Sequence, residues 1–370
     1  MTGSFEIEVA RLRSVVADVK GVVEARSTIP ILSNVLLTVE RDALTVTGTD
    51  LDLMVQRRVA LADAEPFVIT VEAAVLDRIT AKLPAEASAK VKLADGKLTI
   101  SAGRSRFQLP TLPSDDFPVM SADTRQACEF TMQSFYLNAA IGCVSHAIST
   151  EETRYYLGGI FMHAPGAQDL RFATTDGNRL ARGIMALPDG ADALPDVIMP
   201  RKLTKLLSGL LDHHEGEVLV SVTDRLLRFE MGDTTLTGKT IDGTFPDYAR
   251  VIPVGNPKRL DIGREALLDA VSRVVTVSTD KVRAVKLSLT RDLVTVSVTS
   301  SEKGDGREEV PCSWDSGPME IGFNSRFLTD TLGQLTVDTV EAYLDEPESP
   351  VLWRDSEAAT AVFVLMPLRV

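Results

Sequence analysis

The sequence is poor in cysteine and histidine, and these shortages argue against several classes of protein. Its three cysteines, Cys128, Cys143 and Cys312, are odd in number and widely separated, so they form neither a disulfide framework nor a Cys-x-x-Cys metal site. We expect them to be small, buried apolar side chains. Two of the four histidines, His213 and His214, are adjacent in an expected loop, and the chain has no His-Glu-x-x-His motif and no nucleophile elbow. The cysteines and histidines therefore give no sign of a metal site, and the sequence gives little support to an enzyme.

The chain also lacks a long apolar run. No segment approaches the roughly 20 consecutive apolar residues that cross a bilayer. The first six residues have neither the basic region nor the apolar region of a signal peptide. We therefore expect a cytoplasmic protein that does not interact with membranes.

Positive charge is in short supply as well. The 39 Lys and Arg residues are outnumbered by 52 Asp and Glu residues, which gives a net charge of −13. A protein that holds nucleic acid through a broad basic surface gains its affinity by neutralising phosphates, so the composition argues against that mode of binding. The chain has no Gly-x-x-x-x-Gly-Lys-Ser/Thr nucleotide-binding loop, and we expect no cofactor.

What the sequence does contain is an internal repeat. Its 370 residues are too many for one ordinary core, and three weakly similar units follow one another with a period of about 125 residues, the size of a domain. Each unit opens with a short strand and a helix, continues with a pair of alternating strands, and then gives another strand and a second helix. The expected helices are 9–20, 72–82, 133–147, 200–211, 264–276 and 324–334, and the expected strand pairs are 35–39 with 44–48, 159–163 with 170–174, and 285–289 with 293–298.

Two helices against many antiparallel strands in each unit predict an α+β fold of three similar domains. Pro-rich ends with turn residues mark the borders, so we place the domains at residues 1–120, 127–250 and 257–370. Such domains leave sheet edges, which are hazards unless they are paired. Three like domains joined end to end could pair their edges into an arc, and two arcs could close a ring.

One element of the repeat contains turn residues of particular interest. The stretch 172–183 in the second unit corresponds to residues 47–58 in the first. In it, Thr175-Asp-Gly has ordinary turn chemistry, because Gly accepts positive φ and Asp bonds its own backbone. In the first unit we expect Asp50 and Asp52 to share one face of a strand. They could hold a cation there, although alternating carboxylates are usually a solvated strand face.

At this point the residues resemble a known family over nearly the whole chain. Its most specific segments are Thr28-Ile-Pro-Ile-Leu-Ser-Asn-Val-Leu-Leu, Gly48-Thr-Asp-Leu, Gly103-Arg-Ser-Arg-Phe, Arg154-Tyr-Tyr-Leu, Thr175-Asp-Gly-Asn-Arg-Leu, Pro200-Arg-Lys, Asp242-Gly-Thr-Phe-Pro-Asp-Tyr and Met366-Pro-Leu-Arg. In this order and spacing, together with the threefold repeat, the sequence is similar to the bacterial DNA sliding clamps, the beta subunits of DNA polymerase III.

The resemblance implies a fold and a function. It implies a head-to-tail homodimer that forms a closed ring, with helices lining a hole around duplex DNA. It also implies that the ring tethers the DNA polymerase III alpha subunit and other proteins with clamp-binding motifs to the template. A clamp loader, which is an ATPase, would open and close the ring, and the clamp itself would catalyse no reaction.

The resemblance further implies three sets of functional residues. A groove for a short extended partner peptide would be formed by Leu157, Thr175, Gly177, Asn178, Arg179, Leu180, Pro246, Arg250, Val251, Val364, Leu365, Met366, Pro367, Leu368 and Arg369. Residues facing DNA would be Arg26, Tyr155, Tyr156, Arg201, Lys202 and Lys205. The seam between subunits would include Phe107, Thr276 and Val277. Asn178, Leu368 and Val370 stand where a familiar family member has His, Met and Leu, which leaves the peptide preference open.

The distribution of charge answers the objection raised by the net charge. The six expected helices carry roughly +5 and the rest of the chain about −18. A mildly positive lining inside an acidic exterior would hold DNA weakly and let it slide. Glu151 and Glu152, in contrast, fall where a polar DNA contact is expected.

Other interpretations stay open at this point. One is a metal-dependent hydrolase of repeated α+β domains that uses Asp50, Asp52 or Asp176, and another is a peptide-binding scaffold that does not bind DNA. For single sites, residues 363–366 could be an ordinary final strand, and Phe107 could be a core residue. The basic DNA-facing candidates could be solvated surface, and the two tyrosines could serve only packing.

Overall fold

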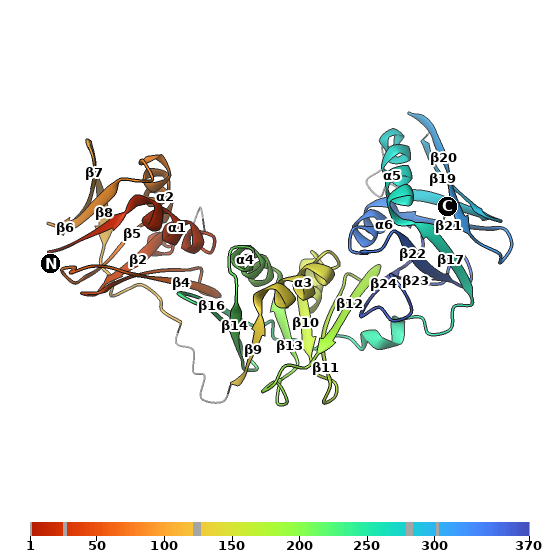
Figure 1. Ribbon diagram of the computed structural model, residues 1–370, viewed down its shortest axis with the longest axis horizontal. Helices are drawn as coiled ribbons and strands as arrows, with labels where there is room; N and C mark the ends of the chain where they lie inside the picture. Colours follow the sequence, from red (N-terminus) through yellow and green to blue (C-terminus); the bar gives the residue numbers. More distant parts are fainter. Residues whose placement is uncertain (1, 25–27, 121–126, 279–283, 301–302, 370) are drawn as a thin grey trace. The chain divides into compact units, whose positions relative to one another are not determined.

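The computed structural model describes residues 2–24, 28–120, 127–278, 284–300 and 303–369. The chain divides into two compact units, whose helices and strands are labelled in Figure 1. Unit 1 consists of residues 1–138, 188–195 and 202–240, and unit 2 of residues 139–187, 196–201 and 241–370. Each unit contains one continuous sheet of twelve strands. No helix in these described ranges is long and apolar enough to cross a membrane.

Unit 1 holds the elements of the N-terminal third of the chain and part of the middle third. Its strands are β1 (Gly3–Glu8), β2 (Asn34–Val39), β3 (Ala43–Thr49), β4 (Leu53–Ala60), β5 (Phe67–Glu72), β6 (Ser88–Ala94), β7 (Lys97–Ala102), β8 (Ser105–Leu112), β9 (Cys128–Gln133), β14 (Glu217–Val222), β15 (Leu226–Met231) and β16 (Thr234–Lys239). They follow the order β1-β6-β7-β8-β5-β2-β3-β4-β16-β15-β14-β9. Helices α1 (Val9–Lys20) and α2 (Ala73–Lys82) pack side by side against this sheet (Figure 1).

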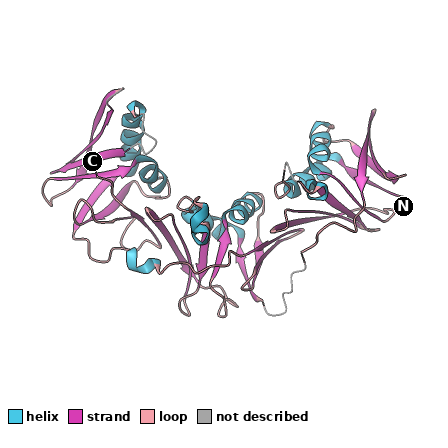
Figure 2. Cartoon of the chain, turned by 180° about the vertical axis from the view of Figure 1, so that it is seen from behind, coloured by secondary structure: helices cyan, strands magenta, loops and turns pink. Residues whose placement is uncertain are grey.

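Unit 2 has the same design. Its strands are β10 (Gly159–His163), β11 (Asp169–Thr175), β12 (Arg179–Ala186), β13 (Val197–Pro200), β17 (Lys258–Gly263), β18 (Ala284–Thr290), β19 (Leu293–Ser300), β20 (Gly304–Ser313), β21 (Met319–Asn324), β22 (Thr339–Leu344), β23 (Val351–Arg354) and β24 (Ala361–Leu365). They follow the order β13-β10-β11-β12-β24-β23-β22-β17-β20-β19-β18-β21. Helices α5 (Arg264–Val274) and α6 (Ser325–Leu332) pack against each other on one face of the strands (Figure 2).

The remaining two helices are α3 (Ser134–Ser145) and α4 (Arg201–Leu211), and the border between the units falls within them, after Asn138 in α3 and after Arg201 in α4. With them, the element order shows one pattern six times over: a strand, a helix and then three strands. Two such halves make each of three domains, so the predicted α+β fold with two helices per domain is confirmed. Four short 3₁₀ helices, η1 (Pro30–Ser33), η2 (Glu152–Leu157), η3 (Tyr248–Val251) and η4 (Val275–Val277), lie between these elements.

Strand pairing follows the same logic in every domain. The opening strand of one half pairs antiparallel with the first strand after the helix of the other half, as in β1 with β6 and β17 with β22. The last strands of the halves have another role, because β4 pairs with β16 and β12 pairs with β24. These two antiparallel pairs carry the sheet across the two junctions between domains, one within each unit.

Apolar periodicity explains why these segments form these elements. In α1 the buried residues Val9, Leu12, Val16 and Val19 are those that the helical spacing predicts. Along β6, buried and exposed side chains alternate, as expected for a strand with one face on the core. The predicted helices differ from the observed ones only at their ends. Pro200, for example, is the last residue of β13 rather than the first residue of the helix.

The cysteines are free, and only Cys128 is fully buried. Cys143 and Cys312 are half-buried, so the expectation of buried side chains was wrong for these two. Burial raises the pKa of both thiols to about 11. They therefore remain protonated at neutral pH, and a protonated thiol is a poor nucleophile.

Candidate functional site

A five-residue turn, residues 175–179, joins β11 to β12 and lies at the centre of the candidate site. Thr175 Oγ1 donates to the Arg179 carbonyl at 2.7 Å and accepts from the Gly177 N–H at 3.1 Å. Asp176 Oδ1 accepts from the N–H groups of Asn178 and Arg179 at 2.9 and 3.1 Å. Gly177 has a φ of +90°, which glycine adopts without steric cost. The turn is therefore held in shape by its own side chains.

The same turn is present in the first domain, between β3 and β4, with Thr49 equivalent to Thr175, one residue away from the alignment that the sequence repeat predicts. Thr49 Oγ1 donates to the Leu53 carbonyl at 2.8 Å and accepts from the Leu51 N–H at 3.1 Å. Asp50 Oδ1 accepts from the N–H groups of Asp52 and Leu53 at 3.0 and 2.7 Å. Leu51, at the position of Gly177, has a φ of +80°. The two turns share a backbone and differ in the side chains that they carry.

This turn corrects the expectation that Asp50 and Asp52 share a strand face. Both residues lie in the bend, where Asp50 bonds to its own backbone, as Asp does in turns. The second oxygen of Asp50 pairs with Lys202, and Asp52 pairs with Lys239 at 2.9 Å. In the part of the chain that the structure describes, no three His, Cys, Asp or Glu side chains are grouped to hold a metal ion. The carboxylates are committed to the turn and to lysines.

An apolar cavity of about 200 Å³ lies beside the second turn. Of the predicted groove residues, it is lined by Leu157, Thr175, Gly177, Arg179, Leu180, Pro246, Val251, Val364 and Met366. Leu157, Leu180 and Val364 are buried, whereas Val251 and Met366 are 52% and 40% exposed. The cavity thus has a buried apolar floor and an accessible apolar rim, which suits the side chains of an extended peptide.

The other predicted groove residues lie outside this cavity. Leu365 is buried, and the Arg250 side chain is exposed and pairs with Asp247 at 2.8 Å. Asn178 contributes its carbonyl, which accepts from the Met366 N–H at 2.8 Å. A second cavity of about 390 Å³ is lined by Pro367, Leu368 and Arg369 together with residues of β21 and the loop before β23.

Two residues that line the apolar cavity, Asp247 and Tyr248, were missed by the sequence analysis. They follow Pro246 directly in the segment Asp242-Gly-Thr-Phe-Pro-Asp-Tyr, so continuing the wall along that segment would have found them. The Tyr248 hydroxyl and His163 Nε2 are 2.8 Å apart. His163 in turn stacks on Phe161, and Phe161 stacks on Phe245 with ring centroids 4.4 and 4.9 Å apart. The stack of His163, Phe161 and Phe245 thus supports Tyr248 in the cavity wall.

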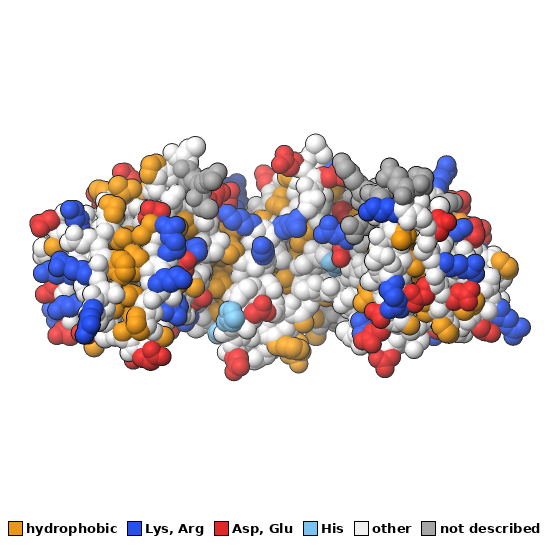
Figure 3. All heavy atoms as spheres, turned by 90° about the horizontal axis from the view of Figure 1, so that it is seen from above, with side chains coloured by type: hydrophobic (Ala, Val, Ile, Leu, Met, Phe, Trp, Pro, Cys, Tyr) orange, Lys and Arg blue, Asp and Glu red, His pale blue; other side chains and the backbone are white. Residues whose placement is uncertain are grey.

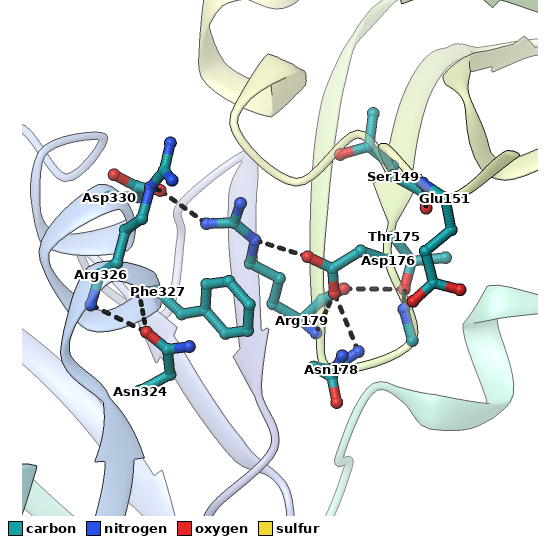
Figure 4. A network of polar contacts seen from close by, with 12 residues as sticks. Ser149, Glu151, Thr175, Asp176, Asn178, Arg179, Asn324, Arg326, Phe327 and Asp330 are labelled. Atoms are coloured by element: carbon teal, nitrogen blue, oxygen red, sulfur yellow. Dashed lines mark hydrogen bonds and ion pairs between the residues drawn. The ribbon is translucent and has the colours of Figure 1, made fainter. Parts of the chain in front are cut away.

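Arg179 is among the residues that line the cavity, and its guanidinium points toward Asp330 of α6 (Figure 4). Its Nε donates to Asp176 at 3.0 Å and its Nη1 donates to Asp330 on α6 at 2.8 Å. The guanidinium lies 4.2 Å from the centre of the Phe327 ring. Burial, and then the positive charge of Arg179, lower the pKa of nearby His146 to about 4. His146 is therefore neutral at physiological pH.

The candidates for DNA contact are placed on two elements. Arg201, Lys202 and Lys205 are all exposed on α4, and Lys202 pairs with Asp50. Figure 3, which looks down onto the helices of Figure 1, shows Lys and Arg side chains where α4 lies. In η2, Tyr155 is 58% exposed whereas Tyr156 packs against a buried apolar cluster. Arg26 lies outside the described residues.

The seam candidates lie at strand edges and helix ends. Phe107 is half-buried on β8, so it is not part of the fully buried core. Thr276 is exposed and Val277 half-buried in η4, at the end of α5. Among the described residues, positions 105–110 of β8 pair only with β7, and positions 304–311 of β20 pair only with β19. Both strands thus have one edge free along most of their length.

Comparisons with known proteins agree over the whole chain. Three family models match: "DNA polymerase III beta subunit, N-terminal domain" over residues 3–121, the central domain over 131–247 and the C-terminal domain over 249–369. The chain is 43% identical over 370 residues to the "Beta sliding clamp" of Caulobacter vibrioides (strain NA1000 / CB15N), covering 98% of this chain and 99% of that protein. It is 34% identical over 368 residues to that of Escherichia coli (strain K12), with 99% of each chain covered.

Solved structures give the same result. A DnaN sliding clamp from Bartonella birtlesii bound to griselimycin superposes with a TM-score of 0.97 at 38% sequence identity, with both chains fully covered. A Caulobacter crescentus beta sliding clamp, described with PEG bound to a putative beta-motif tethering region, superposes with a TM-score of 0.95 at 42% identity, again with full coverage.

Proposed function

The chain belongs to the DNA polymerase III beta subunit family, the beta sliding clamps, and on this basis we propose how its residues perform the work of a processivity clamp in DNA replication. The match of all three family models, in order along one chain, is the observation that carries this function. We place the three domains at 1–120, 127–250 and 257–370, because each range contains two of the six strand-helix-strand halves.

The repeat itself suggests how two copies join. Of the six last strands, four pair across domain junctions, as β4 with β16 and β12 with β24, so β8 and β20 are left. In each junction the last strand of a first half meets the last strand of a second half. Pairing β20 of one subunit with β8 of another repeats that rule and makes a head-to-tail homodimer. When this β20–β8 pairing forms at both seams of the dimer, the two subunits close a ring, and neither β8 nor β20 keeps a free edge.

Charge favours this pairing over the pairing of like edges. Two exposed arginines, Arg104 and Arg106, precede Phe107 at the edge of the first domain. Along β20 lie Asp305, Arg307, Glu308 and Glu309. Arg307 pairs with Glu309 at 2.9 Å and Glu308 pairs with Arg273 of α5 at 2.7 Å, so this edge keeps a small excess of negative charge. A basic edge facing an acidic edge is attractive, whereas each edge facing its own copy is repulsive.

The ring holds duplex DNA by topology more than by affinity. The exposed Arg201, Lys202 and Lys205 of α4 supply a few phosphate contacts, and Tyr155 is accessible for another contact. So few contacts give weak, salt-sensitive and sequence-independent attraction. Such attraction lets the clamp slide, and the closed ring prevents its escape.

The cavity beside the 175–179 turn is the binding site for partner peptides. Its buried Leu180 and Val364 accept apolar anchors, and Met366 at the rim adapts to different partners. The relative from Bartonella birtlesii is described as bound to griselimycin, and we expect this compound to occupy the same cavity here. The natural occupants would be the polymerase alpha subunit, the clamp loader and other proteins with clamp-binding motifs.

The clamp contributes no catalysis of its own. Asp50, Asp52 and Asp176 are committed to turns and to cationic partners, which leaves the alternative of a metal-dependent hydrolase without support. A clamp that serves chromosome replication in a bacterium acts in the cytoplasm. Loading onto DNA would rely on the separate clamp-loader ATPase, because the chain has no nucleotide-binding loop.

Primer extension with the polymerase and the clamp loader tests the role of the cavity. Leu180→Ala and Met366→Ala each remove apolar surface from it, so product length per binding event and griselimycin affinity should fall together. Phe135→Ala, which truncates an exposed aromatic on α3 outside the cavity, should change neither. If the two cavity variants bind griselimycin and extend primers like the native protein, the cavity is not the partner site.

A further inference from the structure

Two walls of the partner cavity depend on the position of one turn. Arg179 pairs with Leu365 at the start of the β12–β24 ladder, and the Asn178 carbonyl accepts from the Met366 N–H at 2.8 Å. Gly177 lines the cavity from the turn, and Met366 lines it from the C-terminal segment. A small displacement of the turn would therefore move both walls at once.

The Arg179 side chain links this turn to α6, whose residues are not among those that line the cavity. This side chain is only 9% exposed. Its Nε donates to Asp176 on the turn at 3.0 Å, and its Nη1 donates to Asp330 on α6 at 2.8 Å (Figure 4). Charge-assisted hydrogen bonds of this kind are stronger and more directional than neutral ones.

The start of α6 is itself fixed, so it can serve as an anchor. Asn324 caps the helix by accepting from the N–H groups of Arg326 and Phe327 at 3.0 and 3.4 Å. The cap sets the position of the Phe327 ring, which packs against the Arg179 guanidinium. α6 thus presents a carboxylate and an aromatic face to the same buried arginine.

A polar cavity of about 460 Å³ surrounds this contact. Besides Asp176, Arg179 and Asp330, the charged and titratable residues that line it are Glu151, Arg201, the neutral His146 and Arg326, which lies 3.9 Å from Asp330. Loss of the Asp330 charge would leave a buried guanidinium with one carboxylate and a neighbouring cation. The arginine would then have to shift, and the turn would shift with it.

The first domain junction shows that the turn does not need this link in order to fold. There, Leu53 stands at the position of Arg179, and Leu206, at the equivalent place on α4, stands where α6 has Asp330. The turn nevertheless makes all four of its hydrogen bonds. There, α4 contacts the turn through a different pair, Lys202 with Asp50, so what distinguishes the junction with the cavity is the link from the fifth turn residue, Arg179, to Asp330.

We propose that Asp330 is a positioning residue of the partner site: through Arg179 it holds the 175–179 turn in the geometry that binds partner peptides, which its own side chain does not touch. The inference rests on the proposed role of the cavity. It implies a linkage between the cavity and α6, and such linkages are reciprocal. A bound ligand should therefore stabilise α6, and disruption at α6 should weaken ligand binding.

Griselimycin binding to the full-length protein, measured by calorimetry, tests this. We expect Asp330→Asn to weaken binding about tenfold, with Asp330→Glu recovering part of the loss. Asp261→Asn, which removes a carboxylate paired with Arg259 at 2.9 Å on β17, should bind like the native protein. Amide exchange gives a second result: griselimycin should slow exchange in α6 of the native protein and not in Asp330→Asn.

The outcomes separate this inference from the proposed function. If Leu180→Ala abolishes binding while Asp330→Asn binds like the native protein and α6 exchange is unaffected by ligand, the positioning role is wrong and the cavity stands. If native protein does not bind, or Leu180→Ala has no effect, both proposals are overturned. Should Asp330→Asn fail to fold, the double variant Arg179→Leu with Asp330→Leu copies the first junction. It should fold and bind about tenfold more weakly, and native-like binding would refute the proposal.

Discussion

Replacing Gly177 by leucine would convert the turn at the partner site into a copy of the turn in the first domain. Leu51 occupies the equivalent position with a φ of +80°, and the same four hydrogen bonds surround it. The chain itself thus shows that leucine is compatible with this backbone. We predict that Gly177→Leu folds and assembles but loses its partners.

The expected magnitudes follow from two contacts. A non-glycine residue in the left-handed region costs about 1–2 kcal/mol, which should lower the melting temperature by a few degrees without preventing folding. At the site, a Cβ on residue 177 would come within 2.6 Å of Arg154 Nη1, so Arg154 must move. Gly177 itself lines the cavity, which has a volume of only about 200 Å³, so both the leucine and the displaced arginine would stand close to the bound ligand. We expect affinity to fall at least about tenfold, or 1.4 kcal/mol.

Calorimetric titration with griselimycin and thermal unfolding of the same preparations measure both effects. The matched control is Leu51→Gly, which makes the reverse change in the turn without the cavity and should leave griselimycin affinity unchanged. Native affinity in Gly177→Leu would refute the reasoning, because the cavity would then tolerate a side chain in its wall. Equal loss in Leu51→Gly would refute it too, since the effect would not depend on the cavity.

Three further predictions address the seam, the buried histidine and the DNA surface. Phe107→Ala should raise the dimer dissociation constant, measured by sedimentation, about tenfold or more, whereas Phe135→Ala, which changes an exposed residue of α3, should leave it unchanged. Equal dissociation constants for Phe107→Ala and the native protein would contradict the β8–β20 seam. The pKa of His146 is about 4 in the folded chain against an ordinary 6.5, so the unfolded chain binds more protons between these values. The free energy of unfolding should be constant above pH 6.5 and fall by at most about 3 kcal/mol as the pH drops toward 4. Denaturant unfolding of His146→Gln should show a smaller fall over this range, and an equal fall would mean that His146 does not cause it. Arg201→Ala should reduce the slope of log K against log salt for non-specific DNA binding by about 1, and an unchanged slope would mean that Arg201 makes no phosphate contact.

Local patterns in the sequence were sufficient to predict the helices and the strand pairs. The spacing of Val9, Leu12, Val16 and Val19 gave α1 its bounds, because an apolar stripe at helical period has few other solutions. The turn at 175–177 was also recognised from a local pattern, the Thr-Asp-Gly sequence. It misled at Asp50 and Asp52, where alternation suggested a strand although both aspartates belong to a turn.

Contacts between distant segments could not be obtained in this way. Arg179 and Asp330 are 151 positions apart, and His163 and Tyr248 are 85 apart, so no local pattern connects them. Which last strands pair across the junctions is likewise decided by packing between domains. The family resemblance identified most of the residues that line the cavity. It assigned no role to Tyr248, which lines the cavity, or to Asp330, which contacts the cavity residue Arg179.

The central claim is that this chain stays on DNA because it encircles it. Clamp loaded onto nicked circular duplex, washed at high salt and then treated with an enzyme that linearises the circle tests this directly. The protein should remain on the circle and be lost from the linear product, since a closed ring slides off a free end. Equal retention on both forms would show that affinity, and not topology, holds the protein, and would contradict the account.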